Sequence, residues 1–183
     1  QLGNQVLFIP TAGNVEDYRG YIDEALQSFA DLGFQVEVLD ISACDRETAQ
    51  AKIFQSKLLY FSGGNTFYLL QELKKKQLLS LIKEQIADGM VYVGESAGAV
   101  ITAEDIDYIR LMDDKAVAKE LNDTEALKEA DFYLLPHVGE EPFVESSQAT
   151  LDTYSDQLDL LPLNNRQAVL VEGEEVKVLE ENK

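Results

Sequence analysis

The sequence predicts an α/β domain with a mostly parallel sheet that helices cover on both faces. Short apolar runs alternate with longer segments of helical periodicity, and the runs are apolar throughout rather than at every second residue. A strand that is apolar at every position is typical of a parallel sheet buried on both faces. Because crossover connections between parallel strands are right-handed, helices are expected on both sides of the sheet.

Strands and helices alternate through the first half of the chain. The expected first helix carries apolar residues at steps of three and four between Val15 and Leu32, with Asn14 as its N-cap and Gly33 as its stop. The expected strands are 6–10, 34–39, 58–61 and 90–94, and the other expected helices are 47–54, 63–73 and 78–87.

Beyond residue 100 the pattern becomes less regular. No internal repeat or linker interrupts the chain, so we expect one domain over residues 1–183. Short strands are expected at 106–111 and 132–135, a helix at 144–158, and a terminal hairpin from 168–171 and 176–179.

Composition excludes several classes of function. The net charge of −19 argues against nucleic acid or an anionic membrane as a partner, because both require a basic surface. No apolar stretch approaches the roughly 20 residues of a membrane helix, and no signal peptide opens the sequence. The single cysteine, Cys44, excludes an intrachain disulfide and fits a cytoplasmic location. Without clustered His or Cys ligands, we expect no metal and no other cofactor.

The segment from Val91 to Val100 carries the strongest chemical signal. An apolar strand ends in Gly94-Glu95-Ser96-Ala97-Gly98 and passes into a helix start made of small residues. This is the strand–turn–helix context of a nucleophile elbow, which projects a serine hydroxyl from the carboxyl edge of the sheet. The helix start directs N–H groups at the same place, where they favour developing negative charge. A turn selected only for packing is the alternative interpretation.

A serine nucleophile needs a base, and His137 is the only histidine in the chain. It follows the expected strand 132–135, at the strand end where α/β sheets bind their ligands. A third group should orient the imidazole. Asp113 and Asp114 follow the expected strand 106–111 and are the best-placed carboxylates, although spacing alone does not choose between them.

A second glycine-rich turn, Ser62-Gly63-Gly64-Asn65-Thr66, also lies between a strand and a helix. Its free N–H groups could form half of an oxyanion hole or hold a phosphate. The turn lacks the lysine of a P-loop and the third glycine of a dinucleotide fingerprint, so nucleotide binding is disfavoured.

Three segments resemble the peptidase E (α-aspartyl dipeptidase) family of serine peptidases, which is related to cyanophycinase. Gly63-Gly64-Asn65-Thr66-Phe67 is similar to its glycine loop, Gly94-Glu95-Ser96-Ala97-Gly98-Ala99 to its nucleophile segment, and Pro136-His137 to its histidine segment. The resemblance runs from Val6 to about His137. It implies a flavodoxin-like three-layer sandwich, as in class I glutamine amidotransferase domains, and serine exopeptidase activity on short peptides.

The same resemblance implies roles for individual residues. Ser96 would be the nucleophile and His137 the base. Because the family's acid follows an Ile-Arg pair, Ile109-Arg110 makes Asp114 the better match, with Asp113 one residue away. Gly64 and Ala97 would supply the oxyanion N–H groups, within a substrate-binding set of Gly63, Gly64, Asn65, Ala97 and Glu95. Glu95, Glu140 and Glu141 are candidates for binding a substrate ammonium group.

Two departures from the family pattern change what we expect. No counterpart of the family's first strand precedes Gln1, so the sequence is either truncated or a shorter variant. Residues 129–165 contain eight Asp or Glu and no Lys or Arg, where the family has its specificity arginine, so we expect no preference for aspartyl peptides. We expect a monomer or homodimer. A catalytically silent binding domain, and an esterase or amidase, are the alternatives.

Overall fold

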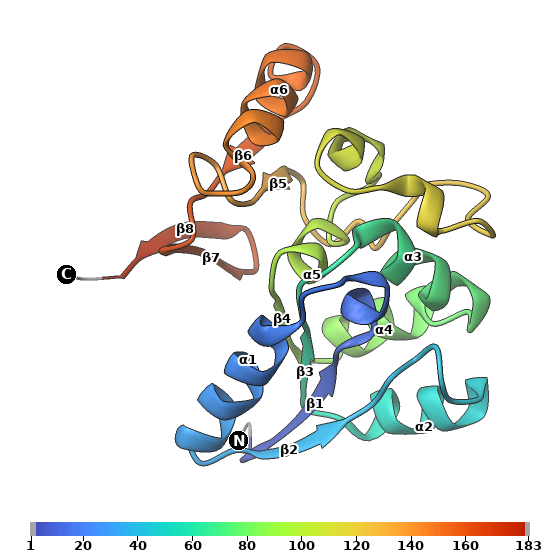
Figure 1. Cartoon of the computed structure of the whole chain (residues 1–183). Coiled ribbons are helices and arrows are strands. Elements are labelled where there is room, and N and C mark those ends of the chain that lie inside the picture. The colour runs from blue at the N-terminus through green and yellow to red at the C-terminus, as the bar shows by residue number, and fades with distance from the viewer. Residues whose placement is uncertain (1–2, 182–183) are drawn as a thin grey trace.

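The computed structural model describes residues 3–181. Its centre is a four-stranded sheet with the order β2-β1-β3-β4, in which every pair of neighbours is parallel (Figure 1). This confirms the predicted α/β class and the four strands of the first half. The strands are β1 (Gln5–Ile9), β2 (Gln35–Val38), β3 (Leu58–Phe61) and β4 (Val91–Gly94).

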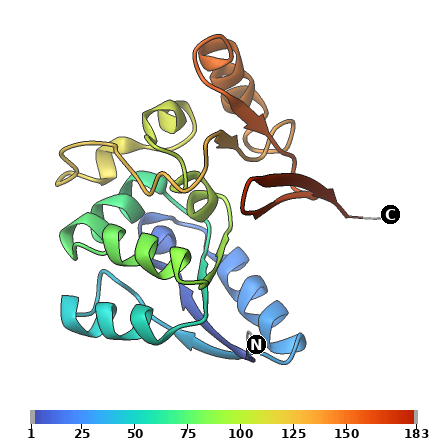
Figure 2. The ribbon, with the colours of Figure 1, turned by 180° about the vertical axis from the view of Figure 1, so that it is seen from behind.

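Helices cover both faces of this sheet, as the crossover rule predicts (Figures 1 and 2). One face packs against α1 (Gly20–Asp31). The other face packs against α2 (Arg46–Gln55), α3 (Thr66–Lys75) and α4 (Leu79–Ala87). The result is the predicted three-layer arrangement of helix, sheet and helix.

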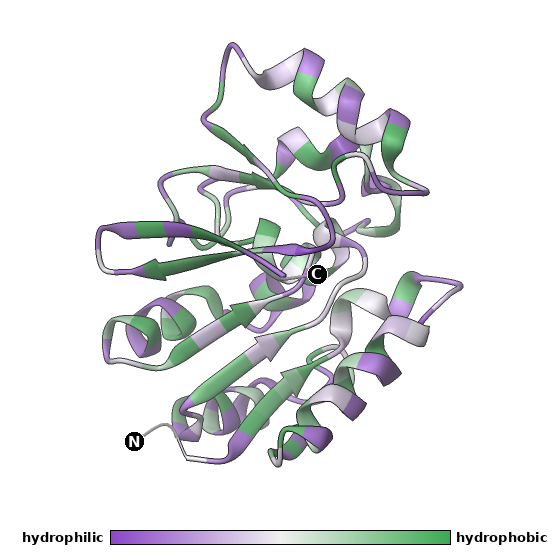
Figure 3. Cartoon of the chain, turned by 90° about the vertical axis from the view of Figure 1, so that its left-hand side faces the viewer, coloured by the Kyte–Doolittle hydropathy of each residue, from purple (hydrophilic) through white to green (hydrophobic). Residues whose placement is uncertain are grey.

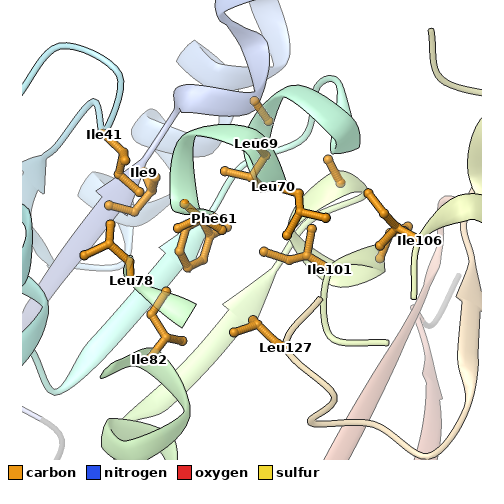
Figure 4. Close-up of a cluster of buried hydrophobic side chains, with 14 of the residues drawn as sticks. Ile9, Ile41, Phe61, Leu69, Leu70, Leu78, Ile82, Ile101, Ile106 and Leu127 are labelled. Atoms are coloured by element: carbon orange, nitrogen blue, oxygen red, sulfur yellow. The ribbon is translucent and has the colours of Figure 1, made fainter. Parts of the chain in front are cut away.

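Alternate residues of β1 belong to the two cores. Val6 and Phe8 pack with Ile22 of α1, whereas Leu7 and Ile9 belong to the larger cluster on the opposite face. Figure 4 shows this larger cluster around Phe61. The strands of the sheet are mostly hydrophobic in Figure 3, while the helices alternate between hydrophobic and hydrophilic stripes. Burial on both faces therefore explains the continuous apolar runs.

The first helix starts later than predicted. Thr11–Val15 forms a short 3-10 turn, η1, and α1 begins only at Gly20. Asn14 does not cap a helix, because its side-chain amide donates instead to Asp40 Oδ2 at 2.8 Å and to Ser42 Oγ at 3.0 Å. Its amide therefore ties the loop after β1 to the loop after β2. Gly33, with φ +83°, ends the helix as predicted.

The predicted strand at 106–111 is wrong. The segment Asp107–Leu111 is a 3-10 helix, η2, which buries Tyr108 and Ile109. Its entry is fixed by the Asp105 carboxylate, which accepts from the N–H of Asp107 at 2.7 Å. Because Ile106 and Ile109 are three residues apart, a single helical turn places both in the core.

The remaining elements follow α5 (Ala97–Val100), the short helix after the elbow. Strand β5 (Tyr133–Leu135) pairs in parallel with β6 (Leu160–Pro162), a strand that the sequence analysis did not predict. The predicted helix and the terminal hairpin are confirmed. The helix is α6 (Val144–Tyr154), and the hairpin is formed by β7 (Gln167–Glu172) and β8 (Glu175–Glu180). Another 3-10 turn, η3 (Lys115–Val117), lies between η2 and β5. Between residues 3 and 181, no helix is both long and apolar enough to cross a membrane.

Candidate active site

Ser96 lies on a sharp bend between β4 and α5. Its backbone has φ 46° and ψ −107°, a conformation that residues with side chains adopt rarely and at a cost in free energy. The flanking glycines are required by close backbone contacts. A Cβ on Gly94 would lie 2.3 Å from the Gly98 carbonyl oxygen, and one on Gly98 would lie 2.5 Å from the Phe61 carbonyl oxygen. The Gly-x-Ser-x-Gly pattern is therefore a consequence of how tightly this bend is packed.

The structure brings Ser96 and His137 together. Ser96 Oγ lies 2.9 Å from Nε2 of His137, although the two residues are 41 positions apart in the sequence. His137 also has a positive φ, of 62°, directly after β5. Its imidazole stacks on the ring of Phe143, with 4.7 Å between the ring centroids. The stacking limits the rotation of the imidazole and keeps Nε2 directed at the serine.

The other imidazole nitrogen contacts a residue that the sequence analysis missed. His137 Nδ1 lies 2.6 Å from Oδ1 of Asn165. The parallel pairing of β5 with β6 explains this contact, because Leu135 lies opposite Pro162 and the two strands end at the same edge. The N–H of Val138 also donates to the Leu163 carbonyl at 2.9 Å, which holds the two loops together beyond the strands.

The two carboxylates predicted for this position lie elsewhere. Asp114 caps η3, where its carboxylate accepts from the N–H of Ala116 at 2.8 Å. Asp113 accepts from the N–H of Thr66 at 2.7 Å, at the start of α3. Burial raises the pKa of Asp113, and both the hydrogen bonds from Thr66 and the nearby His137 oppose that rise. Neither carboxylate is hydrogen-bonded to the imidazole.

The glycine loop after β3 lies beside the elbow. The N–H of Gly63 donates to Glu95 at 3.3 Å, and the Tyr60 hydroxyl donates to the same carboxylate oxygen at 2.5 Å. Glu95 therefore fastens the loop to the elbow. Gly64 has φ 129°, and a Cβ there would lie 2.3 Å from the carbonyl carbon of Ala12, so only glycine fits.

Two N–H groups of this region have no hydrogen-bond partner among residues 3–181. Gly64 makes no N–H hydrogen bond within residues 3–181. Ala97 is the first residue of α5, where an N–H has no acceptor inside the helix. The side chain of Asn65, in contrast, is used by the protein itself. Its Oδ1 caps α3 through the N–H of Tyr68, and its Nδ2 donates to the Asp114 carbonyl at 3.0 Å.

The Ser96–His137 pair and the glycine loop after β3 line a cavity of about 490 Å³. This volume is within the usual range for small-molecule sites. Of the sequence-predicted residues, Ala97, Glu140 and Glu141 do not contribute to its lining. Between residues 3 and 181, no group of three or more His, Cys, Asp or Glu side chains is arranged to hold a metal ion. The predicted residues that line the cavity are Gly63, Gly64, Asn65, Glu95, Ser96, Asp113, Asp114 and His137.

An α/β fold with a Ser–His pair beyond the carboxyl ends of two strands, β4 and β5, is the architecture of a hydrolytic enzyme. A family model described as peptidase family S51 matches residues 1–179, and the chain therefore belongs to that family of peptidases.

Comparisons with individual proteins agree with this family. An uncharacterized peptidase of Pasteurella multocida is 44% identical over 169 residues, which are 92% of this chain and 82% of that protein. A peptidase E of a Shewanella species is 36% identical over 133 residues, but these cover 72% of this chain and only 52% of that protein. The crystal structure of a candidate peptidase E protein from Listeria monocytogenes superposes with a TM-score of 0.94 at 39% identity, covering 100% of this chain and 89% of the other.

Proposed function

We propose that the protein is a serine exopeptidase that hydrolyses short peptides through an acyl-enzyme. The observation that carries this proposal is the 2.9 Å contact between Ser96 Oγ and His137 Nε2 at the wall of the cavity. His137 accepts the hydroxyl proton as Ser96 attacks the scissile carbonyl, and returns it to the leaving amine. Water, deprotonated by the same imidazole, then hydrolyses the acyl-enzyme.

Asn165 has the third role in this proposal, the one that the sequence analysis gave to Asp114. Its Oδ1 accepts a hydrogen bond, so the 2.6 Å contact requires the proton of the neutral imidazole to be on Nδ1. That tautomer leaves the Nε2 lone pair free for the serine proton. An amide orients the ring in this way, but it supplies no negative charge for the imidazolium that forms.

The tetrahedral intermediate needs donors for its oxyanion. The N–H of Gly64 and the N–H of Ala97 are our candidates, because one is unpaired and the other begins a helix beside Ser96. The tight fit of Gly64 against the backbone of Ala12 holds its N–H in a fixed position. Donors fixed before the reaction need no reorganisation as charge develops.

The test is hydrolysis of a dipeptide library by the wild type, Ser96→Ala and His137→Ala. Each substitution should lower kcat/KM by about 10³-fold or more, because both groups act in one step. Ser28→Ala is the matched control, since Ser28 is exposed on α1 and bonds only the Glu24 carbonyl. Full activity in either site variant would refute the role proposed for that residue.

A neutral group at His137 Nδ1 also favours a second candidate, a binding domain that keeps the elbow without turnover. Peptides that bind to the wild type without being cleaved, over a range of pH, would support this candidate. An esterase or amidase acting on other acyl groups is the remaining alternative. Comparing the hydrolysis of ester and peptide substrates that share one acyl residue distinguishes it from an exopeptidase. We also propose a cytoplasmic location, which rests only on the composition and the single Cys44.

A further inference from the structure

The Asp and Glu side chains that line the cavity beside Ser96 give it a negative charge. Four carboxylates contribute to its lining, and no Lys or Arg does so among the residues that the structure describes. An anionic substrate side chain would therefore meet like charge, with no Lys or Arg in the described lining to compensate it. The four carboxylates are those of Glu16, Glu95, Asp113 and Asp114.

Two of these carboxylates are already used by the fold. Asp114 caps η3, and Glu95 accepts from both Tyr60 and Gly63. The other two retain binding capacity. Asp113 uses one oxygen for the N–H of Thr66, and Glu16 has no side-chain hydrogen bond or ion pair with any residue in 3–181.

Glu16 and Asp113 line the same cavity, and their negative charges repel each other. Burial raises the pKa of Glu16, and the charge of Asp113 raises it further. Burial likewise raises the pKa of Asp113. Two partly desolvated carboxylates that face one space are destabilised as anions, and a cation between them would offset both the desolvation and the repulsion.

Tyr21 is an independent sign of a missing ligand. It lines the same cavity, and its hydroxyl has no hydrogen-bond partner among residues 3–181. The pKa of Tyr21 is raised to about 12, by burial first and then by Glu16, Glu95 and Asp113, while the nearby Arg19 opposes the rise. Buried polar groups are nearly always paired, and this hydroxyl can accept a hydrogen bond from an ammonium group.

We propose that Glu16, Asp113 and Tyr21 form a subsite for the positive charge of the substrate residue whose carbonyl Ser96 attacks. The subsite rests on the proposed function in one respect, that a short peptide binds beside Ser96. The ligand chemistry is an ammonium or guanidinium group, which comes either from the α-amino group or from a Lys or Arg side chain. Peptides with an acidic residue at this position are excluded.

Calorimetric binding to the Ser96→Ala protein tests this subsite without requiring turnover. The ligands are Lys-Ala, norleucyl-Ala, N-acetyl-norleucyl-Ala and Asp-Ala. The difference in affinity between Lys-Ala and norleucyl-Ala measures the effect of a side-chain cation. The difference between norleucyl-Ala and its acetylated form measures the effect of the charged α-amino group. We expect about a five- to tenfold loss of affinity in at least one of these pairs when the charge is absent, and the weakest binding among the free dipeptides for Asp-Ala.

The variants Glu16→Gln and Asp113→Asn, added to Ser96→Ala, should remove that charge preference. Glu84→Gln is the matched control, because Glu84 is exposed on α4 and does not contribute to the cavity lining. The proposal is overturned if neither pair shows a preference, if Asp-Ala binds most tightly, or if the preference survives both substitutions. Because binding is read directly, a wild type without turnover would refute the proposed function and leave this result standing.

Discussion

Oδ1 of Asn165 lies 2.6 Å from Nδ1 of His137, on the edge of the imidazole opposite the nitrogen that contacts Ser96. The contact is made across a parallel strand pair, over 28 positions of sequence. An amide in this place can hold the tautomer of a neutral imidazole, but it cannot neutralise the imidazolium. Asp113, whose carboxylate interacts electrostatically with His137, is a candidate source of that negative charge.

Removing the Asn165 amide should slow catalysis. In Asn165→Ala the imidazole loses its orienting acceptor, and we expect kcat to fall about 10- to 1,000-fold with a smaller change in KM. Steady-state kinetics on the best dipeptide of the library measures this. Asn164→Ser is the matched control, because the Asn164 side chain only accepts from the N–H of Arg166 and a serine hydroxyl can replace that bond. Equal losses in both variants would mean that the loop, and not the contact, matters.

Replacing the amide by a carboxylate should shift the pH profile. In Asn165→Asp an anion next to Nδ1 favours the imidazolium over the neutral imidazole. Since the base must be neutral to accept the serine proton, the acid limb of the kcat/KM profile should move to higher pH. A profile of the variant that coincides with that of the wild type would contradict the assignment of His137 as the base.

The elbow should not tolerate an added methyl group at Gly98. In Gly98→Ala the Cβ would collide with the Phe61 backbone, so we expect a loss of roughly 1–3 kcal/mol in unfolding free energy and loss of activity. Denaturant unfolding measures the first effect. Gly33→Ala is the comparison, because it introduces strain at φ +83° in open space and should cost about 1 kcal/mol without affecting activity. Retained activity in Gly98→Ala would show that the bend is not tightly packed.

The half-buried carboxylate of Asp113 should lower stability at neutral pH. Its folded pKa is raised above the unfolded value of about 3.9, so ionisation costs more in the folded state. The penalty is absent below the unfolded pKa and fully present above the folded one. Asp113→Asn should therefore raise the unfolding free energy near pH 7, with a gain that vanishes towards about pH 3. A destabilised variant at neutral pH would contradict this prediction.

The strands that form the sheet could be predicted because each is buried on both faces, which leaves a continuous apolar run. The elbow could be predicted because close backbone contacts nearby require its glycines. The histidine could be predicted because His137 is the only one in the chain. Local patterns failed where a distant partner decides the structure. Asn14 bonds Asp40 and Ser42 rather than a helix end, and the run at 106–111 finds no neighbouring strand and coils into η2.

Asn165 escaped the sequence analysis for the same reason. Its role depends on β6, a three-residue strand that is too short to give a periodic signal. The residues expected to orient the imidazole were carboxylates between Ser96 and His137, whereas Asn165 is an amide that lies beyond the histidine in the sequence. The one usable sign was its position three residues beyond the short apolar segment Leu160–Pro162.

Labelling with a fluorophosphonate probe, followed by intact-mass and peptide analysis, tests the central claim most directly. The account predicts one adduct on the wild type, located at Ser96, none on Ser96→Ala, and much slower labelling of His137→Ala. An unlabelled but correctly folded wild type, or an adduct that persists in Ser96→Ala, would contradict it.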